Sequence, residues 1–75
     1  MKNVVINVEP VQLYKILKFE GWADSGGEAK AAIGEGLVLV NGEVETRKRR
    51  QIVAGDLIEF DGKKIKIVRS DIDQG

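Results

Sequence analysis

Four cationic residues follow one another in "ETRKRRQIVAGD": Arg47, Lys48, Arg49 and Arg50. They are four of the chain's 12 Lys and Arg residues, yet 12 acidic residues bring the formal net charge to zero. Adjacent like charges repel one another, so we expect the folded protein to gain little from this run. Guanidinium groups suit forked contacts with phosphate and stacking on a base. The run therefore predicts a polyanionic partner, although many such runs are only solvated loops.

A second candidate site is the stretch "SGGEAK", which begins at Ser25. Ser25 and Glu28 have the spacing of a capping box, in which the hydroxyl accepts a hydrogen bond from the Glu28 amide. Gly26 and Gly27 leave the amides of the first turn uncovered, and the N-terminus of a helix attracts anions such as phosphate. Lys30 follows one turn after Gly26 and could reach a phosphate held there.

Each of these features also has an ordinary structural explanation. The two glycines could simply permit close packing of the second helix against the first helix or against Trp22. Lys30 could be a solvated lysine. Trp22 could stack on a base, but filling the space between the two helices is the commoner role for such a side chain.

Enzyme chemistry is not indicated by the residues present. The chain has no Cys and no His, the residues that most often serve as nucleophile, general base and metal ligand. Glu43 and Glu45 alternate on an expected strand, where such acids usually form a solvated face. We therefore expect no catalysis, no cofactor, no metal ion and no small-molecule substrate.

The stretch "EPVQLYKILKFEG" predicts the first helix. Pro10 suits the first helical position, Glu9 places negative charge near the positive end of the helix dipole, and Gly21 suits the position after the helix. An apolar stripe with helical spacing, which Tyr14 or Phe19 could extend, is formed by Leu13, Ile16 and Leu17. The second helix follows Ser25 and ends at Gly36, with a slim apolar face of Ala29, Ala32 and Ile33.

Two hairpins are predicted in the second half of the chain. Asp61-Gly62 is a hairpin turn that sets Ile58 opposite Ile65 and Glu59 opposite Lys64, with Phe60 and Ile67 on the apolar face. Asn41-Gly42 marks the first hairpin in the same way. A two-residue turn there places Val38 and Val40 on one face with Glu43 and Glu45, but Leu37 and Leu39 make the other face apolar too. The residues do not decide which face is the core.

The resulting fold class is α+β, with two packed N-terminal helices against a small antiparallel sheet of two hairpins. Residues 1–8 are a short strand or an extended arm, and residues 70–75 are expected to be a frayed tail. The length of 75 residues predicts a single domain spanning 1–75. The longest apolar run is too short to span a bilayer, so we expect a cytoplasmic protein with no membrane partner.

The chain resembles the RNA-binding module named after small-subunit ribosomal protein S-four, also called the αL motif. The resemblance covers about residues 11–68 and rests on motifs in their usual order. They are Ser25 with "AK" at 29–30, "GLVLVNG" at 36–42, and "GDLI" at 55–58. Many members have Arg after the helix-opening Ser, where this chain has Gly26. The stretches "EGWADSGGEAK" and "VETRKRRQIVAGD" are similar to the small stand-alone YbcJ-like branch, which has Ser-Gly there and a basic run after the hairpin.

The resemblance implies an RNA-binding module that acts alone. We therefore expect a bacterial, monomeric protein that binds structured RNA, such as ribosomal or transfer RNA. Phosphate and shape readout is expected because the chain has no stacking platform of several aromatic rings. The expected face joins the N-terminus of the second helix, including Ser25, Gly26, Gly27 and Lys30, to the basic loop at Arg47, Lys48, Arg49 and Arg50, with Lys18 nearby. The alternative is a protein–protein adaptor whose basic loop docks on an acidic partner.

Overall fold

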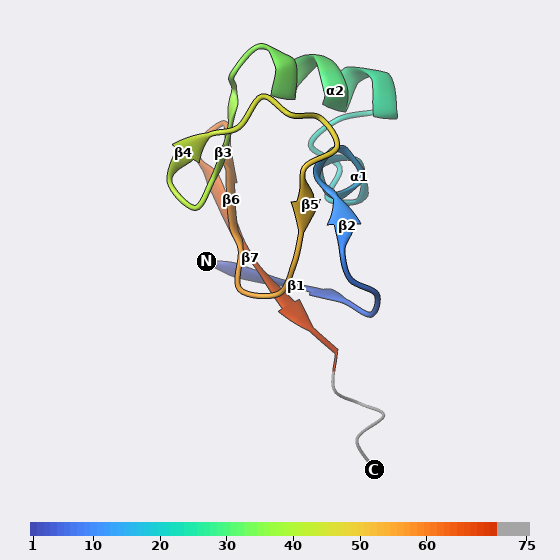
Figure 1. Ribbon diagram of the computed structural model, residues 1–75. Coiled ribbons are helices and arrows are strands. Elements are labelled where there is room, and N and C mark those ends of the chain that lie inside the picture. The colour runs from blue at the N-terminus through green and yellow to red at the C-terminus, as the bar shows by residue number, and fades with distance from the viewer. Residues whose placement is uncertain (71–75) are drawn as a thin grey trace.

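The structure is a computed structural model that describes residues 1–70. Figure 1 shows two helices above and beside a twisted sheet, with a smaller pair of strands next to the first helix. The strands are β1 (Lys2–Ile6), β2 (Val11–Gln12), β3 (Val38–Val40), β4 (Glu43–Val44), β5 (Gln51–Ile52), β6 (Leu57–Phe60) and β7 (Lys63–Arg69). The helices are α1 (Leu13–Phe19) and α2 (Gly26–Gly34).

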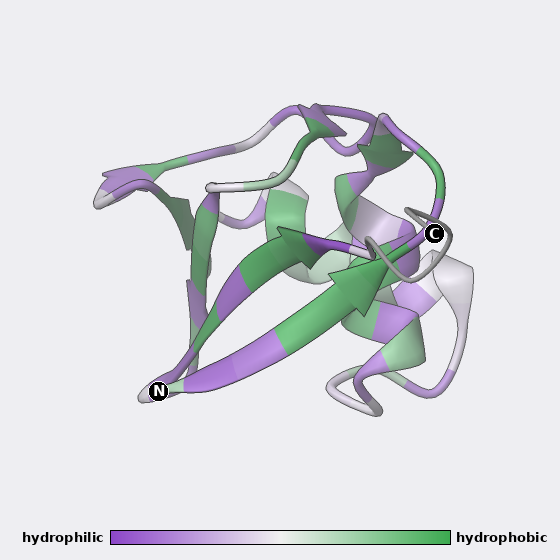
Figure 2. Ribbon diagram, turned by 90° about the horizontal axis from the view of Figure 1, so that it is seen from below, coloured by the Kyte–Doolittle hydropathy of each residue, from purple (hydrophilic) through white to green (hydrophobic). Residues whose placement is uncertain are grey.

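The main sheet has the strand order β1-β7-β6-β3-β4, and β2 pairs with β5 in a separate two-stranded sheet. The second hairpin has the predicted register, with Ile58 opposite Ile65 and Glu59 opposite Lys64. The expectation of a purely antiparallel sheet is wrong, because β1 joins β7 in parallel. Figure 2 shows β1 and β7 side by side, each with a hydrophobic stretch toward its end. Those apolar residues let the N-terminal segment add a strand to the sheet.

The first hairpin also forms as predicted, with Leu39 opposite Val44 around the Asn41-Gly42 turn. Asn41 has a φ of 54° and Gly42 a φ of 85°, the left-handed conformations that a tight two-residue hairpin turn requires. The structure decides the face that the residues left open. Val38 and Val40 are buried in the core, whereas Val44 on the other face is 60% exposed.

The predicted start of the first helix is wrong. The helix begins at Leu13, and Pro10 precedes it in the segment that leads into β2. Gln12 is extended, with φ −71° and ψ 139°, because Val11 and Gln12 pair with β5. Glu9 lies away from the helix and accepts hydrogen bonds from Ala54 N (2.7 Å) and Arg69 Nη1 (2.6 Å). The predicted end is confirmed, since Gly21 follows the cap residue with a φ of 76°.

The second helix begins as the capping box predicts. Ser25 Oγ accepts from Glu28 N at 3.1 Å, and the Glu28 carboxylate accepts from Asp24 N rather than from the Ser25 amide. The helix ends before Gly36, which has a φ of 80°. Both ends of α2 therefore follow from local signals, whereas in α1 only the end does.

One hydrophobic core lies between the helices and the sheet. The predicted stripe of α1 is buried in it, and so are Ala29 and Ile33 of α2. Phe19, which the sequence suggested as an extension of that stripe, is instead 70% exposed. Ser70 N donates to Ile6 O at 2.9 Å, so the first residue of the expected tail is attached to β1. The rest of that expected tail lies outside the described residues.

Candidate nucleic-acid interface

The basic loop is held against the start of α1 by backbone hydrogen bonds. Leu13 N donates to Arg50 O at 2.9 Å, and Tyr14 N donates to Lys48 O at 3.2 Å. The first amides of a helix have no partner within the helix, and no side chain caps α1. The loop therefore serves as the N-terminal cap of α1. Figure 1 shows this connection, in yellow, crossing from β4 past α2 to β5 beside α1.

A buried carboxylate organises two of the four cations. Glu45 is only 6% exposed and accepts from Arg47 Nε at 2.8 Å, Arg47 Nη2 at 3.0 Å and Arg50 Nη1 at 2.6 Å. Its carboxylate also accepts from the backbone amide of Arg47. The hydrogen bonds from Arg47, helped by Arg50, lower the pKa of Glu45 to about 2, although burial alone would raise it.

Two expectations are wrong at this point. The fold does gain from the cationic run, because Arg47 and Arg50 compensate a carboxylate that would otherwise be buried without a partner. Glu45 is not part of a solvated face. The burial of Glu45 could have been predicted from the alternation of faces in the first hairpin. That alternation placed Glu45 on the same face as Val38, which is the core face.

Most of the N–H donors of Arg47 and Arg50 are nevertheless not used on Glu45. Arg50 uses one of its five N–H donors on Glu45, and Arg47 uses two. A shallow hollow of about 560 Å³ is lined by Arg47, Arg49, Arg50 and Gln51. The hollow is open to solvent and rich in guanidinium groups, so an oxyanion could be bound there by several forked contacts.

The ring of Tyr14 joins the loop to the second helix. Lys30 Nζ lies 4.5 Å from the ring centroid, and Arg49 Cζ lies 5.6 Å from it. Both distances are within the range of a cation–π interaction. Lys30 and Arg49 are 19 positions apart in the sequence but share one aromatic ring. Sequence reasoning treated Tyr14 only as a possible part of the core and missed this role, for which no local signal exists.

The remaining predicted site residues lie around this centre. Ser25 is engaged as the cap of α2, and Gly27 is exposed in its first turn. A Cβ on Gly26 would lie 3.5 Å from Tyr14 Cε2, an ordinary contact, so the close packing does not require glycine. Lys18 is exposed on α1 one turn after Tyr14 and therefore on the same side of that helix.

Lys48 and Trp22 lie away from the hollow. A Cβ on Gly34 would be 3.3 Å from Lys48 Cε, which places this lysine over the last turn of α2, where a cation interacts favourably with the helix dipole. Trp22 was expected between the helices. Its ring instead lies 5.8 Å from that of Phe60 in β6, with Lys63 Nζ 5.9 Å away.

Two further observations concern residues 1–70. No group of three or more acidic side chains there is arranged to hold a metal ion. None of the helices in this part of the chain has the length and apolar character needed to cross a membrane.

Comparison with known proteins identifies the family. The sequence profile described as the S4 domain matches residues 4–68, which is most of the chain. The chain belongs to the S4 domain family. The resemblance seen in the sequence motifs is thereby confirmed, and the match extends seven residues further toward the N-terminus than the motifs did, because it includes part of β1.

Named relatives give the same result. The Escherichia coli (strain K12) protein "Putative RNA-binding protein YbcJ" is 53% identical over 58 residues, which are 77% of this chain and 83% of the relative. The Bacillus subtilis (strain 168) protein "Probable ribosome maturation protein RlbA" is 37% identical over 59 residues, 79% of this chain and 83% of the relative.

A solved structure resembles this S4 domain as well. The solution structure of YbcJ from E. coli, described as revealing an αL motif involved in RNA binding, superposes with a TM-score of 0.69. The two chains are 48% identical, and the match covers 91% of this chain and 87% of the YbcJ chain. The αL fold is therefore shared.

Proposed function

We propose that this S4 domain protein binds structured RNA through one composite face. The face consists of the hollow lined by Arg47, Arg49 and Arg50, the Tyr14 ring with its two cations, and the N-terminal turn of α2. The family membership and the description of YbcJ as RNA-binding support RNA as the partner.

The single observation that carries the proposal is the shared contact of Lys30 and Arg49 with Tyr14. It makes one surface of two cationic segments that are remote in the sequence. Two cations held 4.5 and 5.6 Å from the centre of one ring can follow successive phosphates of a backbone. No catalytic step is needed for this activity, and none is proposed.

Recognition on this face is mainly of phosphate and shape. The hollow offers guanidinium donors from three arginines, which suit a backbone oxyanion better than a base edge. The name of the B. subtilis relative, a ribosome maturation protein, favours ribosomal RNA as the target. The monomeric state, the cytoplasmic location and the single-domain organisation stay predictions.

An amide NMR titration with folded RNA hairpins at low salt tests the proposal. Shifts concentrated in residues 25–30 and 47–50 are the expected result, with Asn3 and Val5 of β1, at the opposite edge of the main sheet from β4, as internal controls. Engagement of four or five phosphates predicts that log affinity falls with log salt at a slope of about −3 to −4. A slope near zero, or shifts spread evenly over the surface, would contradict it.

A second experiment distinguishes RNA binding from the alternative, a protein–protein adaptor. Tagged protein is recovered from cell extract with and without ribonuclease treatment. Loss of the co-purifying material after ribonuclease supports RNA as the partner. Retention of the same acidic protein after complete digestion would favour the adaptor.

A further inference from the structure

A second groove continues from the arginine hollow. It has a volume of about 350 Å³, and Gln51 lines both this groove and the hollow. Its apolar wall comes from the segment before α1 and from the end of α1 itself, and consists of Val8, Pro10, Val11 and Phe19. The groove therefore adds an apolar surface directly beside the guanidinium groups.

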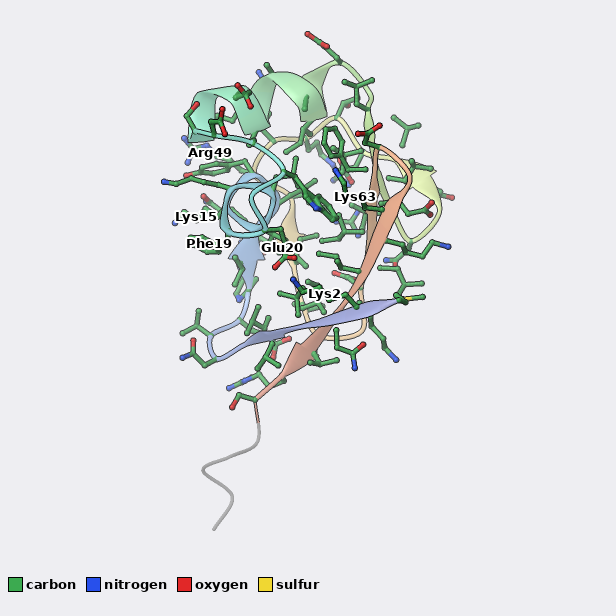
Figure 3. The ribbon with its side chains drawn as sticks, turned by 180° about the vertical axis from the view of Figure 1, so that it is seen from behind. Lys2, Lys15, Phe19, Glu20, Arg49 and Lys63 are labelled. Atoms are coloured by element: carbon green, nitrogen blue, oxygen red, sulfur yellow. The ribbon has the colours of Figure 1, made fainter. Side chains whose placement is uncertain are left out.

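Phe19 is the unusual residue of this groove. It is an aromatic side chain with 70% of its surface exposed, although the core lies on another side of the same helix. Lys15 precedes it by one turn, so the two side chains lie on the same side of α1. Figure 3 shows Arg49, Lys15 and Phe19 along one side of the molecule. Lys15 thus continues the line of positive charge that starts at the hollow, and the exposed ring of Phe19 lies beside it.

Two side-chain amides lie in the same groove. Gln12 of β2 and Gln51 of β5 are directly opposite each other in the two-stranded sheet, and both line the groove. Within residues 1–70, neither amide side chain takes part in a hydrogen bond. Each amide carries donors and an acceptor, the combination that pairs with the edge of a nucleobase.

We propose that this groove binds an unpaired base of the RNA, with the base stacked on Phe19 and its edge facing Gln12 and Gln51. The inference rests on the proposed RNA binding and adds a single-stranded element to it. Continuity with the hollow through Gln51 leads the backbone from the base to the arginines, and Lys15 lies where the adjoining phosphate passes. An apolar protein segment would leave Lys15 and both amides without partners, so the charges and donors favour a nucleotide.

Two hairpin RNAs with the same stem test this inference. One is blunt, and the other carries a short run of unpaired adenosines at one end, prepared in separate 3′ and 5′ versions. A stacked base shifts the ring protons of Phe19 upfield, whereas Phe60, the other phenylalanine of the chain, serves as the control. We expect this shift with an extended hairpin and not with the blunt one.

Substitution of Phe19 gives the matched affinity measurement. Phe19→Ala removes the ring from an exposed position and is expected to reduce the affinity for the extended hairpin roughly 5- to 100-fold, toward that of the blunt hairpin. Phe19→Tyr keeps the ring and the affinity. Val44→Ala, at an exposed apolar position of β4 that lines neither the groove nor the hollow, changes neither affinity.

The possible failures are distinguishable. If the blunt hairpin shifts the loop amides but no extended hairpin shifts the Phe19 ring protons, the proposed base site is wrong and the RNA-binding face is still supported. A protein segment would then be the remaining candidate occupant of the groove. If Phe19→Ala weakens both hairpins equally, Phe19 is not a base site. If no hairpin shifts any amide, the proposed function fails together with this inference.

Discussion

The basic loop and the second hairpin both carry four cations but use them differently. In the hairpin, Lys64 pairs with Glu59 and Lys63 with Asp61, each at 3.8 Å, and Arg69 pairs with Glu9 at 2.6 Å. In the loop, Arg47 and Arg50 share the single carboxylate of Glu45. Three acids balance four cations along the hairpin, whereas one acid faces four cations at the loop. The excess of positive charge is therefore local to the loop in a chain with no net charge.

The difference shows that the four cations of the basic loop do not share one role. Arg47 and Arg50 are partly structural because they neutralise a buried acid. Arg49 lies over Tyr14, and Lys48 lies over the end of α2. Removing all four charges together would therefore disturb the fold as well as the proposed binding face. Variants must therefore change Arg47 and Arg50 separately from Lys48 and Arg49.

The largest expected effect is the loss of the arginines that hold Glu45. Arg47→Ala with Arg50→Ala leaves a buried carboxylate without its cations, so we expect the free energy of unfolding to fall by roughly 2–3 kcal/mol. Urea unfolding followed by circular dichroism measures it. The hairpin control, Lys64→Ala, breaks only the exposed pair with Glu59 and should cost at most about 1 kcal/mol. Equal losses in both variants would remove the contrast between the two regions.

The next effect is on RNA affinity. Lys30→Ala with Arg49→Ala removes both cations of Tyr14, and we expect a loss of about 10- to 100-fold for a folded hairpin RNA at moderate salt. The control is Lys64→Ala with Lys66→Ala, which deletes the same charge from the hairpin and should change affinity less than about three-fold. Fluorescence anisotropy gives both values. Similar losses would mean that net charge, rather than this face, governs binding.

A smaller effect is expected in acid. The pKa of Glu45 is lowered to about 2, chiefly by Arg47, from 4.5. A lowered carboxyl pKa contributes stability above the unfolded value, and this stability is lost as the pH falls from about 4.5 through about 2. The exposure of Arg47 reduces the contribution to on the order of 1–2 kcal/mol.

Thermal unfolding across that pH window measures the contribution. Glu45→Gln should already be less stable at neutral pH and should show a correspondingly flatter pH dependence. An unchanged dependence in that variant would assign the acid sensitivity to other carboxylates.

The smallest effect concerns the ring between the two cations. Tyr14→Leu retains apolar bulk but removes the π face, so we expect RNA affinity to fall about 2- to 5-fold. Tyr14→Phe keeps the ring and should bind as the unaltered protein does. Anisotropy titrations at one salt concentration are sufficient. If Tyr14→Leu binds normally, the cations are positioned by something other than the ring.

Sequence patterns predicted those parts of the fold whose causes are local. The second hairpin was predicted in register because Asp61-Gly62 admits only a tight turn and the alternation of Ile58 and Glu59 sets the faces. The start of α2 was predicted because Ser25 and Glu28 lie within one turn of each other. The start of α1 was not, because its cap is the backbone of a loop more than 30 residues later.

The sequence by itself determined the family, the two helices, the two hairpins and the location of the charge. The helices and hairpins follow from capping residues, turn residues and periodicity, which act over a few neighbouring positions, whereas the family rests on the resemblance of the motifs. Tertiary structure decided that Val38 faces the core, that Glu45 is buried with Arg47, and that Lys30 meets Arg49 at Tyr14. The meeting of Lys30 and Arg49 depends on segments that come together only when the chain has folded. The hairpin turn placed Val38 and Glu45 on one face, but only packing against the helices made that face the core.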